Sequence, residues 1–195
     1  MKLKSFFIAL SLFCVSCSHT HKADNPAPTP PSFPKSVDEA VANPRRTAAN
    51  RLRDQYRHPA DTLKFFGVQP NMTVLEIWPS KGWYTEILAP YLAQEGHYIA
   101  ANSPAENGHP AAAQEFSNLM NANKDVQAKV TLTEFTPSRA INLAPYDSVD
   151  MVLTFRNVHN WMKDHEAQSA FKQFYKALKP GGILGVVEHR AKANK

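Results

Sequence analysis

The sequence of 195 residues contains few of the residues that cross-link a chain or permit tight turns: two cysteines and seven glycines. Both cysteines, Cys14 and Cys17, lie near the start, so a framework of disulfides is excluded. No set of cysteines and histidines has the spacing of a structural zinc site, and we expect no metal. The apolar run at residues 6–15 is too short to span a bilayer as a helix.

Neither sign of charge is in large excess, because the sequence has 22 lysines and arginines and 17 acidic residues, for a net charge of +5. The densest basic stretch, residues 45–57, also contains Asp54 and is preceded by Asp38 and Glu39. A solvated helix face explains it, so nucleic-acid binding is not indicated. The G-x-S-x-G pattern of serine hydrolases is absent, which disfavours that class of enzyme.

Residues 1–17 are typical of a bacterial export signal, with Lys2 and Lys4 before the apolar run. Val15-Ser16-Cys17 resembles the end of a lipobox, in which the cysteine is lipidated and becomes the new first residue. Ordinary signal cleavage is the alternative. Lipidation would supply enough acyl chains for stable attachment to a membrane. We therefore expect an exported protein of the bacterial periplasm or outer membrane, anchored through Cys17.

Fifteen prolines are many, and six of them lie in residues 18–35, which we predict to be an extended tether. The folded domain is expected at 36–195. Its first helix begins at Ser36, which forms a capping box with Glu39. A second helix is expected from Pro44, with Ala48, Leu52 and Tyr56 facing inward, and a third from Pro59 to Gly67. Arg53, Tyr56, Arg57 and His58 are candidate residues of a lid over a binding cleft, or they only cap and brace the edge of the sheet.

The remainder alternates between apolar strands and amphipathic helices, which is typical of an α/β fold. Strands are predicted at 73–77, 96–101, 130–135, 149–155 and 183–188, and helices at 83–92, 106–124 and 165–179. Phe171, Phe174 and Tyr175 of the last helix are among the side chains expected to point inward. Residues 179–182 are expected to form a turn that ends this helix. Residues 149–155 are almost wholly apolar, as expected of a central parallel strand.

Two stretches resemble those of class I S-adenosylmethionine-dependent methyltransferases. They are EIWPSKGWYTEILAPYL at 76–92 and LKPGG at 178–182, and the first resembles a group of bacterial predicted methyltransferases with signal peptides. The resemblance implies a Rossmann-like, doubly wound, mostly parallel sheet in the order 3-2-1-4-5. It also implies S-adenosyl-L-methionine as cofactor, bound by a set of residues at the ends of the first, second and fourth strands: Glu76, Trp78, Ser80, Gly82, Asn102 and Asn157.

Polar residues follow the fourth and fifth strands, at the edge of a parallel sheet where ligands bind. Arg156, Asn157 and His159 follow residue 155, and Glu188 ends the fifth strand. In the resembled family this segment lies beside the methyl donor, so we expect Arg156, His159 and Glu188 to be catalytic and to face an unknown acceptor. An imidazole can act as a base near neutral pH. Alternatively, Asn157 and His159 only cap the next helix.

The resembled fold normally ends in an antiparallel hairpin that covers the fifth strand. Only seven residues follow Glu188, so this hairpin is expected to be missing. The apolar edge at 183–188 would then be exposed, and we expect either a protein partner there or a shortened product of a longer gene. The alternative function is a non-catalytic binding module on a degenerate methyltransferase fold. It is favoured by Trp78 and Ser80 in the places of glycines, by Asn102 in the place of an acid and by the short C-terminus. The export signal also favours it, because S-adenosyl-L-methionine is made in the cytoplasm and is not expected outside it.

Overall fold

The computed structural model describes residues 32–104, 110–139 and 143–192. The predicted signal and most of the tether lie outside this range. Five strands are present in it: β1 (Thr73–Ile77), β2 (His97–Asn102), β3 (Val130–Glu134), β4 (Val149–Phe155) and β5 (Leu178–Val187). The helices are α1 (Val37–Ala42), α2 (Ala48–Arg51), α3 (Asp54–Arg57), α4 (Pro59–Phe66), α5 (Thr85–Leu92), α6 (Pro110–Ala122), α7 (Lys124–Gln127), α8 (Val158–Lys163) and α9 (Ala167–Ala177).

The five strands form one sheet in the order β3-β2-β1-β4-β5, and every pairing is parallel. The predicted fold class and strand order are therefore confirmed. β1 lies at the centre, and its Glu76 is in register with Ala100 on β2 and Leu153 on β4. The carboxyl ends of all five strands meet at one edge, where the chain order reverses between β1 and β4.

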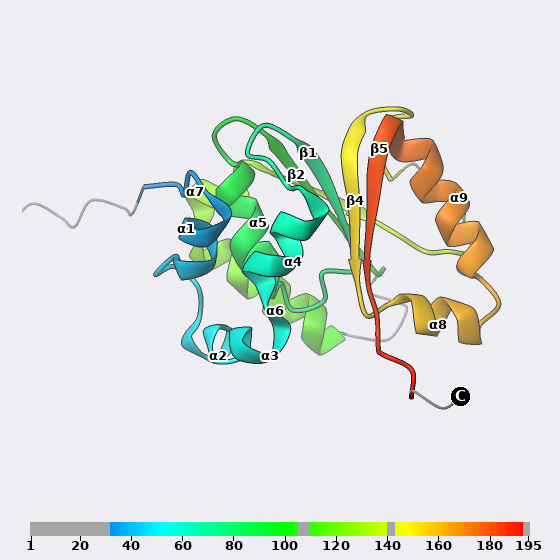
Figure 1. The fold of residues 1–195 in the computed structure, drawn as a ribbon, viewed down its shortest axis with the longest axis horizontal. Helices are drawn as coiled ribbons and strands as arrows, with labels where there is room; N and C mark the ends of the chain where they lie inside the picture. The colour runs from blue at the N-terminus through cyan, green and yellow to red at the C-terminus, as the bar shows by residue number, and fades with distance from the viewer. Residues whose placement is uncertain (1–31, 105–109, 140–142, 193–195) are drawn as a thin grey trace, which may run out of the picture. The chain divides into compact units, whose positions relative to one another are not determined.

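Helices cover both faces of the sheet (Figure 1). On one face, α1, α4, α5, α6 and α7 bury a core with side chains such as Val74 and Leu153. On the other face, α8 and α9 pack against the alternate side chains, including Leu75 and Val152. Because successive side chains of a strand point to opposite faces, each inner strand contributes to both cores.

The central strand–turn–helix unit follows its prediction closely. β1 and β4 have the predicted bounds, because each is a mostly apolar segment with side chains buried on both faces of the sheet. α5 begins at Thr85, two residues later than predicted, and all eight of its residues are buried. The helix is therefore buried all round and not only on the one apolar face that was predicted, because α1 and α7 also pack against α5.

The segment before β1 differs from its prediction. The predicted helix from Pro44 is two short helices, α2 and α3, and its supposed inward side chains Leu52 and Tyr56 are 69% and 78% exposed. The buried side chain here is that of Arg46, which donates from Nη1 and Nη2 to the carboxylate of Asp54 at 2.6 and 2.8 Å. A buried guanidinium requires such a partner, and apolar periodicity does not reveal it.

The last helix and strand also depart from prediction. Tyr175 was predicted to point inward but is 81% exposed. The predicted turn at 179–182 belongs to β5, which pairs with β4 from Leu178 through a register shift between Val149 and Met151. Pro180 is tolerated there because β5 is an edge strand. Ile183 on this edge is 42% exposed, and the expected protein partner for it stays a prediction.

Candidate functional site

The turn between β1 and α5 retains the backbone of a glycine-rich turn with only one glycine. Trp78, Ser80 and Gly82 have φ angles of 50, 56 and 86°, all in the left-handed region that glycine adopts most readily. A Cβ on Gly82 would lie 2.4 Å from Leu119 Cδ2, so α6 packs directly on this turn. A side chain at this position would therefore require Leu119 to shift, in addition to the strained backbone conformation.

Trp78 forms part of the wall of the site. Its indole Nε1 donates to the carbonyl of Phe135 at 3.0 Å, and its ring lies 5.9 Å from that of Phe135 and 5.4 Å from that of Trp161. Both of these rings are buried in the core on the α8–α9 side of the sheet. The indole is thus held by the core, and this placement leaves room for a ligand beside the turn.

A first cavity of about 680 Å³ lies along the carboxyl ends of the strands. This volume is within the range of small-molecule sites. Its lining comes from the turn, the end of β2, α6, the residues after β3, the start of α8 and the α8–α9 connection. It includes Trp78, Ser80, Lys81, Asn102, Ser103, Ala112, Thr136, Pro137, Ser138, Asn157, Asn160, Asp164 and Glu166. Four of the six predicted cofactor residues, Trp78, Ser80, Asn102 and Asn157, therefore line one cavity.

Asn102 stands at the end of β2, where its side chain lines this cavity. An amide both donates and accepts hydrogen bonds, so it suits the hydroxyl groups of a ribose. Asn157 has a second role, because its Nδ2 donates to the carbonyl of Ile77 at 2.9 Å and to Thr154 Oγ1 at 3.1 Å. It thereby joins the ends of β1 and β4 across the floor of the site.

Glu76 is buried beneath the turn and is 3% exposed. The hydroxyl of Tyr98 donates to its Oε2 at 2.5 Å, and Thr85 Oγ1 lies 2.8 Å from the same hydroxyl. Burial raises the pKa of Glu76 to about 7, although its hydrogen bonds with Tyr98 and Thr85 act in the opposite direction. Of the predicted cofactor residues, Glu76 is therefore the one that titrates near neutral pH.

A second cavity of about 360 Å³ adjoins the first and shares Trp78, Ser80, Lys81 and Asn157 with it. Its other walls are residues of the α2–α3 segment, of β1 and the turn between β1 and α5, and of the ends of β4 and β5: Arg53, Arg57, Glu76, Pro79, Trp83, Tyr84, Phe155, Arg156, His159 and His189. Arg156 and His159, two of the three predicted catalytic residues, line this cavity.

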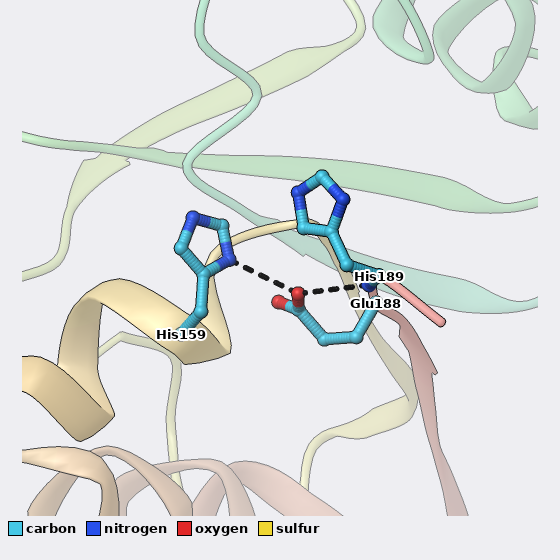
Figure 2. Close-up of side chains that lie close together, drawn as sticks. All are labelled: His159, Glu188 and His189. Carbon is cyan, nitrogen blue, oxygen red and sulfur yellow. Dashed lines mark hydrogen bonds and ion pairs between the residues drawn. The ribbon is translucent and has the colours of Figure 1, made fainter. Parts of the chain in front are cut away.

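The third predicted catalytic residue, Glu188, holds His159 (Figure 2). Its Oε2 lies 3.0 Å from His159 Nδ1, and its Oε1 accepts the backbone N–H of Val158 at 2.7 Å. Burial would raise the pKa of Glu188, but its hydrogen bonds with His159, His189 and Val158 lower it overall. Glu188 is therefore an anion that only accepts, so His159 Nδ1 donates and a neutral ring has its Nε2 as the basic atom.

Three potential metal ligands also meet at this point. Donor atoms of His159, Glu188 and His189 all lie within 4.8 Å of one another. In the structure these groups serve a hydrogen-bond network, since Arg156 Nε donates to His189 Nε2 at 3.2 Å. A cation on His189 would face that guanidinium at close range. The expectation that no metal binds stays a prediction.

The sequence named Arg53 and Arg57 only as lid candidates, and the structure places both in the wall of the second cavity. Arg57 lies over the Trp83 ring at 5.0 Å from its centroid, and Tyr84 stacks on Phe155 at 3.6 Å. The sequence feature that pointed to these two arginines was the occurrence of basic residues in helices just before the central strand. Apolar periodicity in that segment does not reveal that they line a cavity.

Comparison with known proteins identifies the domain. A family model described as a methyltransferase domain matches residues 81–186, more than half of the chain. A search of curated proteins finds no match.

Solved structures share the fold. A SAM-dependent methyltransferase from Aquifex aeolicus is 19% identical with a TM-score of 0.59, covering 73% of this chain and 70% of its own. The YcgJ protein from Bacillus subtilis is 20% identical with a TM-score of 0.52, covering 68% of this chain and 50% of its own. The [4+2]-cyclase SpnF is 16% identical with a TM-score of 0.52, covering 80% and 57%.

S-adenosyl-L-methionine is the cofactor that this family implies, and the residues present fit it. The turn at 78–82 keeps the left-handed backbone of a glycine-rich turn, and the adjoining cavity has the size for such a ligand. Asn102 would hold the ribose, while Ser80 and Asn157 line both cavities. The chain belongs to the class I S-adenosylmethionine-dependent methyltransferase family.

Proposed function

We propose that this protein transfers a methyl group from S-adenosyl-L-methionine to an acceptor bound in the second cavity, with His159 as the base. When bound, the cofactor supplies an electrophilic methyl group. The observation that carries the proposal is the 3.0 Å hydrogen bond between His159 Nδ1 and Glu188 Oε2. It orients the imidazole at the edge of the sheet where ligands bind in such folds.

The role of the pair is to remove a proton from the attacking atom of the acceptor. Glu188 fixes the ring and stabilises the imidazolium that forms when His159 Nε2 takes the proton. Positioning of the acceptor against the methyl group supplies the remainder of the rate enhancement. Arg156 lies beside the pair through its contacts with His189 and is placed to orient the acceptor.

Cofactor binding is tested first by thermal melts of the full chain with and without S-adenosyl-L-methionine or S-adenosylhomocysteine. A ligand at a hundred times its dissociation constant stabilises by about 2.7 kcal/mol, which shifts the midpoint by several degrees. A cooperative melt that neither ligand shifts contradicts the proposal. It would favour the second candidate, a non-catalytic binding module, for which Trp78, Ser80 and Asn102 are the supporting substitutions.

Turnover is tested with tritium-labelled methyl donor and fractionated cell envelope as the source of acceptor. His159→Gln and Glu188→Gln are expected to reduce labelling about a hundredfold or more, because general base catalysis contributes on this scale. His165→Gln is the matched control, since that histidine lies in the connection between α8 and α9 and lines neither cavity. Equal labelling by wild type and both site variants would exclude the assigned base.

We also propose that the protein is exported and tethered to a bacterial membrane through Cys17. The support is the sequence at 1–17, with its basic start, apolar run and lipobox-like end. Among the described residues, no helix is long and apolar enough to cross a membrane. Fractionation of cells that express the wild type and Cys17→Ala, with mass spectrometry of the N-terminus, tests this proposal. An unprocessed N-terminus in the cytoplasmic fraction would contradict it.

A further inference from the structure

Three guanidinium groups from two distant segments line the second cavity. Arg53 and Arg57 come from the α3 segment, and Arg156 follows β4. Arg57 is partly buried, and the other two are exposed to solvent. The cavity also contains His159 and His189, so its polar wall is dominated by groups that donate hydrogen bonds.

These three arginines lack counterions within the part of the chain that the structure describes. Five other cations among the described residues form ion pairs of 2.6–2.8 Å: Arg45–Asp125, Arg46–Asp54, Lys64–Asp38, Lys81–Glu115 and Lys179–Asp150. In contrast, the hydrogen-bond partner of Arg156 is the imidazole of His189, with Nη2 and Nε2 3.1 Å apart. The cavity therefore concentrates positive charge that the described protein does not neutralise.

The two nearby carboxyl groups are already engaged. Glu76 is buried and accepts the hydroxyl of Tyr98, and its pKa of about 7 means that it is often neutral. Glu188 accepts from His159 and from two backbone N–H groups. The pKa of Arg57 is lowered, chiefly by desolvation and then by the positive charges of Arg53 and Arg156. The three arginines therefore repel one another. An anionic ligand would relieve this repulsion.

Arg57 is held in a way that suits such a ligand. Its guanidinium lies over the indole of Trp83, 5.0 Å from the ring centroid. Stacking on an aromatic face restrains the plane of the guanidinium, and its planar fork of N–H donors matches the oxygens of a carboxylate or phosphate. Bidentate contacts of this kind are among the strongest hydrogen bonds in proteins.

The methyl donor cannot neutralise this cavity. S-adenosyl-L-methionine carries a sulfonium, an ammonium and one carboxylate, so it brings net positive charge. Its carboxylate can balance only one of the three guanidinium groups. We propose that the acceptor is an anion, bearing a carboxylate or a phosphate, and that Arg57 and Arg156 bind its charged group. This inference rests on the proposed methyl transfer and deepens it.

The test measures binding of two probe anions, inorganic pyrophosphate and citrate, to the full chain in mild detergent by titration calorimetry. Arg57→Gln and Arg156→Gln are each expected to weaken binding about tenfold or more, as loss of a charge-assisted contact does. Arg57→Lys keeps the charge but loses the planar fork of N–H donors. Its affinity for the anions is expected to lie between those of the wild type and Arg57→Gln. Arg51→Gln is the matched control, because Arg51 is exposed on α2 and lies outside the cavity.

Repeating the titration with saturating S-adenosylhomocysteine separates the two sources of carboxylate. Binding of a probe anion that persists beside S-adenosylhomocysteine supports an acceptor site, and preference for pyrophosphate or citrate assigns phosphate or carboxylate chemistry. Complete displacement would mean that the arginines serve the cofactor's own carboxylate, which overturns the proposal. No binding at about 10 mM anion, or equal weakening by Arg51→Gln, also overturns it.

Failure of the proposed methyl transfer gives a different pattern. If S-adenosylhomocysteine does not bind, but pyrophosphate or citrate binds and Arg57→Gln removes that binding, the methyl transfer is wrong and the anion site stands. If S-adenosylhomocysteine binds and neither probe anion does, the enzyme stands and the anionic acceptor is wrong. The two results distinguish the inference from the function on which it rests.

Discussion

The buried carboxyl of Glu76 should make the stability of this protein depend on pH near neutrality. Its pKa is raised to about 7 from the ordinary value of 4.5, chiefly by burial. The folded state therefore holds a proton that the unfolded chain releases at lower pH. Stability from this group is fully present below pH 4.5 and is lost as the pH rises through 7.

The magnitude follows from the size of the shift. At about 1.4 kcal/mol for each pKa unit, the free energy of unfolding should fall by about 3 kcal/mol between mildly acidic pH and pH 8. For a domain of this size, such a change lowers the melting midpoint by roughly 6–12 °C. The hydrogen bond from Tyr98 to Glu76 Oε2 is retained throughout, since a carboxylate also accepts.

The variant Glu76→Gln removes the titration while keeping an oxygen that can accept from Tyr98. Urea unfolding followed by circular dichroism at pH 5, 6, 7 and 8 is the assay. The wild type is expected to lose about 2.5 kcal/mol more than the variant over this range, because part of the loss occurs below pH 5. Glu134→Gln, an exposed residue at the end of β3, serves as control and is expected to follow the wild type. Parallel curves for wild type and Glu76→Gln would refute the reasoning.

Two further substitutions test packing near the site by the same unfolding assay. Asp54→Asn leaves the buried guanidinium of Arg46 without its counterion and should lower the free energy of unfolding by about 3 kcal/mol. Adding Arg46→Met should restore most of this stability. A decrease below about 1 kcal/mol for Asp54→Asn would show that the pair is not structurally important. Gly82→Ala strains a backbone with φ of 86° and places a methyl group 2.4 Å from Leu119 Cδ2, so it should cost about 1–2 kcal/mol. Gly67→Ala, with a φ of 75° and open space around it, isolates the backbone cost and should be milder; an equal loss would mean that the contact with Leu119 is unimportant.

Local patterns were enough to predict the central architecture. β1 and β4 were predicted to the residue because a strand buried on both faces is mostly apolar, although β1 also contains Glu76 and β4 contains Asp150. The strand order came from the resemblance of the segments at 76–92 and 178–182, and the sheet confirms it. Leu52, Tyr56 and Tyr175 were placed wrongly because apolar spacing does not reveal which neighbours a helix has.

The sequence by itself determined the alternation of strands and helices, the turn at 78–82 and the polar residues at the strand ends. Each of these is encoded within about twenty consecutive residues. Only the tertiary structure decided that Glu188 meets His159, that Arg57 joins Arg156 in one cavity, and that Glu76 is buried against Tyr98. Those contacts join residues 22 to about 100 positions apart. They depend on the parallel pairing that sets β2 beside β1 and brings the carboxyl ends of β4 and β5 to one edge.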